Sequence, residues 1–532
     1  MVAVPSLGMY SSISVARLVN PLMSSQKRLG VALTYATQLV QILSGLIYTP
    51  LMLRLLGQSE YGLYQLVNSV VAYLSLFSLG FGASYMRFYS RYDAQGDTDG
   101  VTRLNGMFMT IFLVMAAVAA AAGCALVGNI RAVFAEGLTD AEYGRATILM
   151  TLMVANMALT FPTSVLDAYA TAKEQFIFQR FINFLQALLN PFLCLPLLIL
   201  GVGSVGMVAV ASALTVAKLV VNWWFAVGRL GMRFAFGHFD WALFREMGVF
   251  TFWIFLNQIM DQINWNVDKF LLGRMVGTTA VAVYGVGAQV NTMYTQLSTS
   301  ISSVFVPQVN RIVAEAAPDA DERLTEVFIK VGRVQFLVVA LVATGFIFFG
   351  MPFVLMWGGP EYGEAYWVAL VLMVPEIVPF IQNIGIEIQR AKNKHQVRSV
   401  VYFCLAIGNI FVSIALIPPF GPVGAALGTA LALLVGQVLF MNWYYHTHLG
   451  INIIAFWKSV AHFLPALVAP VAFGVAVNAL FSITHLWQLA LAVVAYTAIW
   501  FVSMWFLGMN DFERGLVRAP LAKTRHAGAS SI

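Results

Sequence analysis

Long apolar runs separated by short polar segments make up nearly the whole chain. About 20 consecutive apolar residues are needed to cross a bilayer as a helix. Runs of this length occur fourteen times, at 29–53, 60–85, 104–128, 146–168, 176–200, 205–228, 246–270, 280–306, 329–350, 364–388, 398–417, 422–445, 459–482 and 486–508. The pattern predicts an all-α polytopic membrane protein with about 14 transmembrane helices.

The seventh run is the most polar of the fourteen. Within Phe252–Arg274 four polar residues follow the spacing i, i+4, i+7, i+11 and therefore share one helical stripe: Asn257, Asp261, Asn264 and Asp268. An ionisable group at membrane depth costs about 2.5–3.5 kcal/mol by insertion scales, so a lipid-facing stripe is unfavourable. Two interpretations stay open, polar packing between helices and the wall of a hydrated substrate pathway.

Polar side chains recur in the first, second and eighth runs. In the first run Gln38 and Gln41 lie on one helical face, the second run contains Asn68 and the eighth contains Gln289. Each alone is explained by a hydrogen bond between helices, worth about 0.6 kcal/mol on average. Together they indicate a shared cavity.

The tenth run contains carboxylates beside two prolines. Glu376 and Glu387 follow Pro375 and flank Pro379, and proline frees backbone carbonyls and bends a helix. A bent helix with a carboxylate near mid-membrane is suited to binding a coupling H⁺ or Na⁺. The alternative is a carboxylate paired with Lys218 or another buried cation.

Composition supports a membrane class. Of 532 residues 60% are hydrophobic and 10% are charged, against about 25% charged in soluble domains, and mean hydropathy is +0.80. The three cysteines lie singly in separate apolar segments, so we expect free thiols.

The charge distribution orients the spans. With the N-terminus in the cytosol, 24 of the 30 lysines and arginines fall on the inner side and five on the outer side, and Lys218 lies inside a span. This bias follows the positive-inside rule and predicts that both termini are cytosolic. The N-terminal stretch 1–28 does not resemble a signal peptide, because its charges (Arg17, Lys27 and Arg28) follow the weak apolar patches.

A repeat divides the chain. Leu51, Arg54, Gly57, Tyr64 and Arg91 recur 220 positions later as Leu271, Arg274, Gly277, Tyr284 and Arg311. Two parallel six-helix lobes related by a pseudo-twofold axis are expected around a central cavity. The predicted parts are a tail at 1–26, lobes at 27–235 and 236–450, two further helices at 451–510 and a cytosolic tail at 511–532.

Several chemistries are not indicated by the sequence. There is no G-x-x-x-x-G-K-[ST] phosphate loop and no H-E-x-x-H motif, and the predicted loops are too short to hold a catalytic domain. We therefore expect a transporter without a cofactor rather than an enzyme. Arg54, Arg87 and Arg274 lie near predicted span ends, where arginine either snorkels to headgroups or binds phosphate.

Three stretches resemble a known family. These are PLMLRLLGQSEYGLYQLVNSVVAYLSLFSLGFGASYMRFYSRY (Pro50–Tyr92), QINWNVDKFLLGRMVGTTAVAVYGVGAQV (Gln262–Val290) and VFVPQV (Val304–Val309). They resemble the Wzx-type polysaccharide flippases of the MOP superfamily, which also contains MATE drug exporters and lipid II flippases. The similarity spans roughly residues 27–510.

The resemblance implies a flippase in the bacterial inner membrane. Its substrate would be an undecaprenyl-pyrophosphate-linked oligosaccharide, moved from the cytosolic to the outer leaflet by alternating access for surface polysaccharide assembly. Glycosyltransferases and a polymerase of the same pathway would be its partners. A cationic cavity is typical of relatives, and Arg54, Arg87 and Arg274 are candidates for it, although Asp261 and Asp268 make this cavity less positive.

Other functions are alternatives. A MATE-like cation-coupled antiporter of drugs or metabolites usually has twelve spans and an acidic residue in the first, whereas this first run contains neither Asp nor Glu. A lipid II flippase is a second alternative. A scaffolding protein for envelope assembly, or a membrane-embedded enzyme, fits poorly with a long apolar array that has no large loops.

Overall fold

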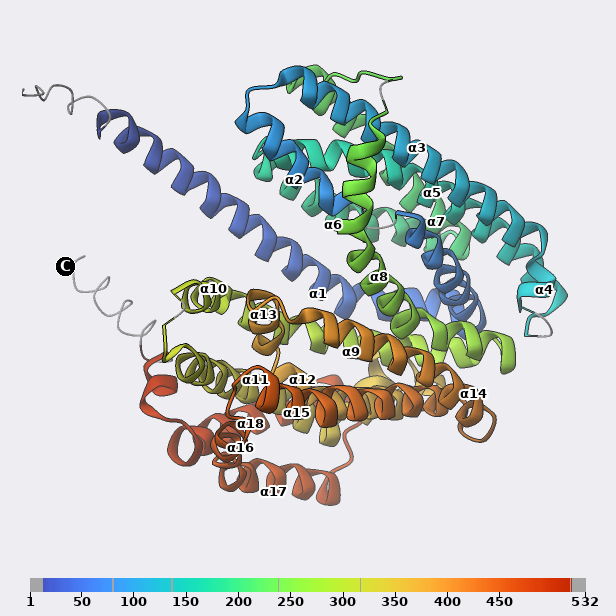
Figure 1. The fold of residues 1–532 in the computed structure, drawn as a ribbon. Helices are drawn as coiled ribbons and strands as arrows, with labels where there is room; N and C mark the ends of the chain where they lie inside the picture. Colours follow the sequence, from blue (N-terminus) through green and yellow to red (C-terminus); the bar gives the residue numbers. More distant parts are fainter. Residues whose placement is uncertain are drawn as a thin grey trace, which may run out of the picture. The chain divides into compact units, whose positions relative to one another are not determined.

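The computed structural model describes residues 13–78, 81–134, 137–237, 239–315, 317–516 and 518, and within these ranges the regular elements are all helical (Figure 1). The α-helices are α1 (Ile13–Ala72), α2 (Phe81–Ala94), α3 (Thr98–Gly128), α4 (Ile130–Phe134), α5 (Asp140–Ala172), α6 (Phe176–Ile199), α7 (Gly203–Trp223), α8 (Trp241–Met275), α9 (Thr278–Ser302), α10 (Val306–Glu315), α11 (Ala320–Trp357), α12 (Ala365–Ile381), α13 (Ile384–Ala391), α14 (His395–Leu433), α15 (Met441–His448), α16 (Ile453–Ala461), α17 (Leu464–Leu480) and α18 (Leu486–Ser503). Short 3₁₀ segments are η1 (Tyr73–Ser78), η3 (Ser303–Phe305) and η4 (Pro360–Tyr362), and π-helical segments are η2 (Trp224–Arg229), η5 (Leu434–Phe440) and η6 (Met504–Gly508). The predicted all-α membrane fold is confirmed.

Eight helical runs within the described residues are long and apolar enough to cross a membrane, and two bent helix pairs raise the number to ten. Two of the eight, Ala36–Ser78 with 43 residues and Gln396–His448 with 53, are about twice the length that one crossing requires. Each contains a backbone break, at Gly57 and at Gly421 respectively. Fourteen spans stay a prediction.

Glycine makes both breaks possible. Gly57 has φ 75° and Gly421 has φ 55°, a left-handed backbone that residues with a Cβ rarely adopt. Gly277 (φ 120°) and Gly201 (φ 77°) lie 220 positions from Gly57 and Gly421. The repeat that was predicted from residues 51–91 therefore extends to the backbone conformation of the later helices.

Side chains that face away from the protein are apolar over much of the surface. Leu200, Leu480 and Phe506 are 76%, 74% and 72% exposed. A water-soluble protein seldom shows so many large exposed apolar residues, and they indicate contact with lipid acyl chains.

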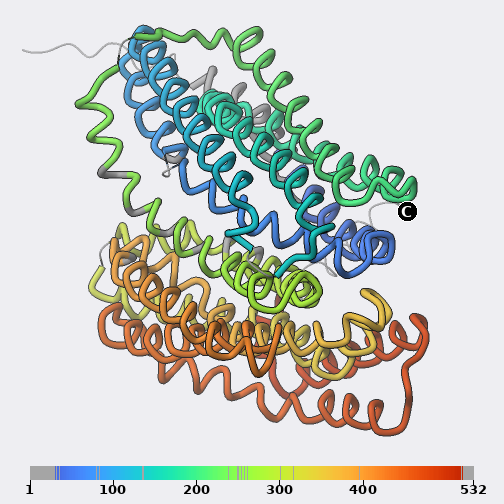
Figure 2. The backbone as a smooth tube through the Cα atoms, turned by 90° about the vertical axis from the view of Figure 1, so that its right-hand side faces the viewer, coloured from blue at the N-terminus to red at the C-terminus, as the bar shows by residue number. Residues whose placement is uncertain are grey.

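The chain forms two compact units. Unit 1 contains residues 1–55, 74–128 and 148–252, and unit 2 contains residues 56–73, 129–147 and 253–532. Figure 2 traces the backbone through both. Two short stretches from the first half of the chain, 56–73 and 129–147, thus belong to unit 2.

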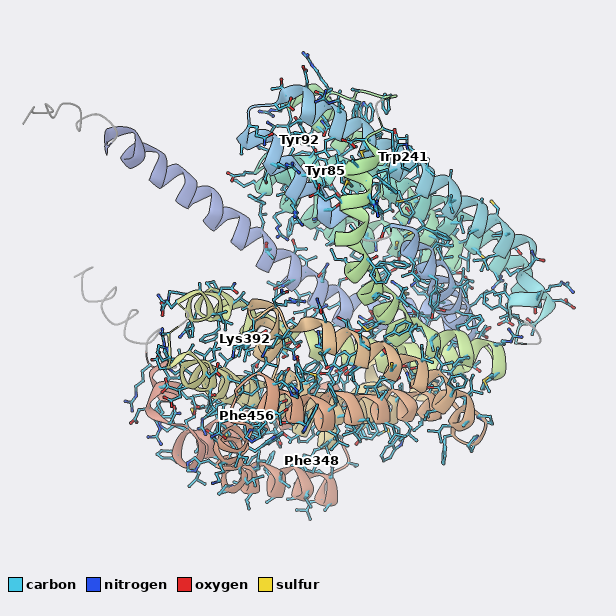
Figure 3. The ribbon with its side chains drawn as sticks, viewed as in Figure 1. Tyr85, Tyr92, Trp241, Phe348, Lys392 and Phe456 are labelled. Carbon is cyan, nitrogen blue, oxygen red and sulfur yellow. The ribbon has the colours of Figure 1, made fainter. Side chains whose placement is uncertain are left out.

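In unit 1, α2 is held against α3 by a buried tyrosine. Tyr85 donates to Asn105 Oδ1 at 2.6 Å, and Asn105 donates to the Arg233 carbonyl at 3.0 Å. Phe81 stacks on Phe244 with ring centroids 5.5 Å apart. These contacts fix the ends of α2, α3 and α8 beside one another (Figure 3).

In unit 2, the C-terminal helices pack on α11. Phe456 of α16 contacts Phe328 edge to face at 4.9 Å, and Phe348 lies 6.2 Å from Tyr496 of α18 (Figure 3). A β-carbon at Gly474 of α17 would approach the Phe348 ring to 2.4 Å, so glycine is required for this packing. The predicted helices at 459–482 and 486–508 are thereby integral to unit 2.

Candidate functional site

A carboxylate held by three hydroxyl groups lies at the centre of unit 2. Asp268 of α8 is 1% exposed. Its Oδ2 accepts hydrogen bonds from Tyr284 Oη and Thr429 Oγ1, both at 2.7 Å, and its Oδ1 accepts one from Ser413 Oγ at 3.2 Å. A buried charge requires such donors, because leaving it unpartnered costs several kcal/mol. We call these four residues the Asp268 cluster.

The kink in α14 brings two members of the cluster together. Ser413 precedes Gly421 and Thr429 follows it, and Asn409 bridges them, donating to Thr429 Oγ1 at 3.1 Å and accepting from Ser413 Oγ at 3.2 Å. A β-carbon at Gly428 would lie 2.4 Å from Ser413 Oγ. The Gly424-x-x-x-Gly428 spacing in the second part of α14 therefore allows the two parts of this helix to pack closely.

A cavity of about 290 Å³ adjoins the cluster within unit 2. Tyr284 and Thr429 line it, and so do Asn264, Asn291 and Glu376. Residues with amide, hydroxyl and carboxyl oxygens thus line one partly open cavity. Such hard oxygen donors suit protons and alkali cations rather than soft metals.

Glu376 of α12 is the second carboxylate of this region. It is 7% exposed, accepts a hydrogen bond from the Asn291 side chain, and its Oε2 has no hydrogen-bond partner. α12 ends shortly after Pro379 and α13 continues at an angle of 47°. The predicted bent helix is confirmed.

Neither carboxylate belongs to an ion pair in the described part of the chain. Lys218, named in the alternative of a Glu376 paired with Lys218 or another buried cation, has its Nζ 3.4 Å from Asp167 Oδ2 in unit 1. Glu387, in contrast, pairs with Arg390 at 2.7 Å one helical turn away. Of the two proposed coupling residues, only Glu376 therefore lacks a local counter-ion.

Unit 1 contains its own intramembrane polar network. Asp167 accepts a hydrogen bond from the buried Asn222 at 2.6 Å, and Lys218 donates to Asn183 Oδ1 at 3.1 Å. The Lys218 and Asp167 side chains keep 19% and 29% exposure. Because charged groups at membrane depth avoid lipid, we expect this partly exposed face of unit 1 to meet protein or water.

One lysine of unit 2 has a neutral partner. Lys269 Nζ donates to Gln65 Oε1 at 3.2 Å, and Gln65 Nε2 donates to Tyr61 Oη at 2.7 Å. Asp268 and Lys269 are adjacent in sequence but bond in different directions, since consecutive helical positions point about 100° apart. The two charges therefore do not form an ion pair with each other.

The remaining predicted cavity residues divide between the two units. Gln38, Gln41, Arg54 and Arg87 belong to unit 1 and are exposed, and Arg87 lies over the Phe88 ring at 5.8 Å. Asn68 and Arg274 are exposed in unit 2, and Gln289 is half-buried there. The side chains of Asn257 and Asp261 lie outside the described part of the structure. These assignments stay predictions.

Sequence reasoning missed five functional candidates: Asp167, Asn222, Asn409, Ser413 and Thr429. Asp167 could have been found from the sequence, because an aspartate inside the predicted span 146–168 requires a partner. Serine and threonine are common in membrane helices, so nothing in the sequence distinguished Ser413 and Thr429 from other hydroxyl residues.

The architecture matches that of helical transporters. The lipid II flippase MurJ, in an inward closed conformation, superimposes with a TM-score of 0.71 at 13% identity over 92% of this chain and 100% of that one. An inward-facing multidrug MATE transporter of the MOP superfamily gives 0.57 at 13% identity over 79% and 96%. The MATE multidrug transporter DinF-BH gives 0.57 at 15% identity over 80% and 96%. These likenesses define the fold as that of MOP transporters.

The sequence places the chain within a family of this class. Residues 29–313 match the family described as "Polysaccharide biosynthesis protein", and the chain belongs to that family. The capsular polysaccharide biosynthesis protein CapF of Staphylococcus aureus is 20% identical over 207 residues, 38% of this chain and 50% of CapF. The probable flippase AglR of Haloferax volcanii is 25% identical over 182 residues, 32% of this chain and 36% of AglR. The match therefore spans half or less of the length of these two relatives.

Proposed function

We propose that the protein is an alternating-access flippase for an undecaprenyl-pyrophosphate-linked oligosaccharide, which it moves from the cytosolic to the outer leaflet. The family match over residues 29–313 is the observation that carries this proposal. Relatives named for capsular polysaccharide biosynthesis and as a probable flippase agree with it. A fold like that of a lipid II flippase supports a lipid-linked substrate.

The headgroup of such a substrate carries two phosphates. Arg54, Arg87 and Arg274 are proposed to bind them, since guanidinium groups bind phosphate oxygens in bidentate fashion. The polar residues Gln38, Gln41, Asn68, Asn257, Asp261, Asn264 and Gln289 would contact the hydrated sugars. Asp261 and Asp268 would keep the potential from being uniformly positive, which favours release.

Coupling to an ion gradient is proposed at Glu376 and the Asp268 cluster. Both carboxylates lie within or beside one cavity, which Arg398 also lines, and neither forms an ion pair among the described residues. An H⁺ or Na⁺ bound there would neutralise a buried charge and change which arrangement of α8, α12 and α14 is stable. No further cofactor is part of the proposal.

The proposed setting is the bacterial cytoplasmic membrane, with both termini cytosolic. The charge bias of the loops supports this orientation. Glycosyltransferases would supply the lipid-linked glycan on the inner side and a polymerase would consume it on the outer side.

Transport in proteoliposomes tests the proposal. A polyprenyl-pyrophosphate-linked oligosaccharide with a fluorescent sugar is incorporated, and a membrane-impermeant quencher reports the fraction in the outer leaflet over time. We expect protein-dependent flipping, and little flipping by Glu376→Gln at equal amounts of reconstituted protein. Wild-type vesicles that flip no faster than protein-free vesicles would refute the proposal.

The likeness to MATE transporters favours a second candidate, a cation-coupled antiporter. The same vesicles distinguish the two. Extrusion of a fluorescent cationic dye driven by a pH or Na⁺ gradient, without glycolipid flipping, would support the antiporter. Flipping of lipid II in preference to other lipid-linked glycans would instead identify a lipid II flippase.

A further inference from the structure

Glu142 connects two segments that are distant in sequence. Its Oε1 accepts hydrogen bonds from Ser59 Oγ at 2.7 Å and from Thr278 Oγ1 at 2.8 Å. The two hydroxyl oxygens are 3.4 Å apart. One carboxylate oxygen thus joins α5 both to the part of α1 after its kink and to the first residue of α9.

The other oxygen of Glu142 has a local structural role. Oε2 accepts from the Thr139 amide and hydroxyl, both at 2.8 Å, and the Glu142 amide lies 3.4 Å from Thr139 Oγ1. This is a capping box at the start of α5. Capping requires only Oε2, so it leaves the bonds of Oε1 unexplained.

The two hydroxyl donors occupy related places in the repeat. Ser59 lies two residues after Gly57, and Thr278 directly follows Gly277, the glycine 220 positions later. Both therefore belong to the first turns of repeat-related helices, where backbone N–H groups favour a nearby negative charge. A single carboxylate satisfies both helix starts only while the two are close together.

Glycines allow the backbones around Glu142 to touch. A β-carbon at Gly62 would lie 1.8 Å from the Thr278 carbonyl oxygen, and one at Gly137 would lie 2.0 Å from the Gly273 carbonyl oxygen. No side chain fits at either place. The segments 56–73 and 129–147 are thus packed directly onto residues 273–278.

Both segments continue into unit 1 at either end, although they belong to unit 2. Alternating access, the mechanism under the proposed function on which this inference depends, changes the relation of the two halves of a transporter. Residues 56–73 and 129–147 must then separate from α9 in one of the states. Hydrogen bonds through one carboxylate oxygen can break and re-form without rearranging a hydrophobic core.

We propose that Glu142 is a gating residue, a releasable latch between the N-terminal ends of the repeat-related helices. In the structure the latch is closed. Ser59 and Thr278 are its two attachment points, and Gly62 and Gly137 provide the close contact that seals it. Each transport cycle opens it once.

A disulfide across the latch tests the proposal. Cys124, Cys194 and Cys404 are first replaced by alanine so that no native thiol reacts. The Ser59→Cys/Thr278→Cys variant is then oxidised, reconstituted and assayed for flipping. We expect the cross-linked protein to stop transporting and to recover on reduction, and the two single-cysteine variants to be insensitive to oxidation.

Unchanged flipping by the fully cross-linked protein would refute the proposal that Glu142 is a releasable latch. A static structural role predicts that outcome, since segments that never part are not affected by a bond between them. Reversal by reductant excludes misfolding as the cause of lost transport.

A second measurement requires no substrate. Ala282 is buried, and its amide nitrogen would lie 3.2 Å from a β-carbon at Gly62, so a cysteine at position 282 leaves both attachment points intact and reports opening through its rate of labelling by a hydrophilic maleimide in detergent. Glu142→Ala should raise the rate roughly tenfold or more, because the two Oε1 bonds to Ser59 and Thr278 are lost together with the two capping bonds of Oε2 to Thr139. Thr139→Ala removes the capping hydroxyl and keeps the Oε1 bonds, so it should raise the rate far less. Arg145→Ala is the matched control. It breaks the neighbouring exposed ion pair to Glu60, 3.2 Å long, and should leave the rate within about twofold.

Equal labelling in Glu142→Ala and in its parent would also refute the latch. The flipping assay and the labelling assay test the flippase proposal and the Glu142 latch separately. If the parent protein flips no glycolipid, the proposed function fails, while the labelling ratio still decides whether Glu142 holds the segments together.

Discussion

A buried ion pair attaches the C-terminal helices to α11, and its removal gives a quantitative prediction. Arg333 and Glu513 are 4% and 2% exposed. Arg333 Nη2 donates to Glu513 Oε2 at 3.0 Å and to the Gly508 carbonyl at 2.9 Å, and Nη1 donates to the Ser459 carbonyl at 2.6 Å. The guanidinium also lies over the Phe463 ring at 4.3 Å.

Removing one partner should cost more than removing both. Glu513→Gln or Arg333→Met leaves one buried charge without its counter-ion, which costs about 3–5 kcal/mol. The double variant Arg333→Met/Glu513→Leu leaves no charge, but it leaves the Ser459 and Gly508 carbonyls without these donors, at about 1–3 kcal/mol each. Arg333→Met alone leaves the same two carbonyls without donors, so their cost cancels in the comparison. The sum of the single effects should therefore exceed the double effect by at least about 2 kcal/mol, which is the cost of the isolated charges.

Hydrogen exchange of the α17 and α18 amides measures this difference. Each single variant should exchange roughly 100- to 4,000-fold faster there, as 3–5 kcal/mol implies. Amides of α3 in unit 1 serve as the internal control and should not change. If the single variants exchange at the wild-type rate, or if their effects simply add in the double variant, the ion pair does not hold these helices.

Two further predictions concern the transport site. Asp268→Asn removes one of two acceptor oxygens, so at least one of its three hydroxyl donors is left without a partner, and each such bond to a charged group is worth about 1.5–3 kcal/mol. We expect flipping in proteoliposomes to lose its response to an imposed H⁺ or Na⁺ gradient, and a retained response would contradict coupling at this carboxylate. Asp261→Asn and Arg274→Ala should each impair surface glycan display at unchanged membrane levels, measured by glycan staining and immunoblotting, and normal display in both variants would contradict their place in the cavity.

The fold followed from the sequence because the bilayer imposes one strong constraint. Every backbone polar group must be satisfied within its own segment, so apolar runs of sufficient length are helices. The hydropathy pattern also located the two backbone breaks, because Gly57 falls between the predicted runs 29–53 and 60–85 and Gly421 falls between 398–417 and 422–445. It did not reveal that 56–73 and 129–147 pack with the second half, because such contacts depend on surfaces that composition does not encode.

The candidate site was only partly predictable. A carboxylate in an apolar helix is visible in sequence through its cost, and this identified Asp268 and Glu376. Its partners are not visible in the same way. Ser413 and Thr429 reach Asp268 only because α14 turns back on itself at Gly421. The gap between the predicted runs 398–417 and 422–445 locates this turn, but it does not specify which side chains the turn brings together.

Comparison of the two halves shows that the Asp268 cluster is specific to the second. At the positions 220 residues earlier, Asp268 corresponds to Tyr48, Ser413 to Leu193 and Thr429 to Ala209. Where the acid is replaced, two of its three hydroxyl donors are replaced by apolar residues as well. An isolated serine or threonine in a membrane helix needs no acid, but a buried acid requires its donors. The charge and its hydroxyl partners therefore form one unit that the shared framework of the repeat does not require, which is what the proposed coupling role of Asp268 predicts.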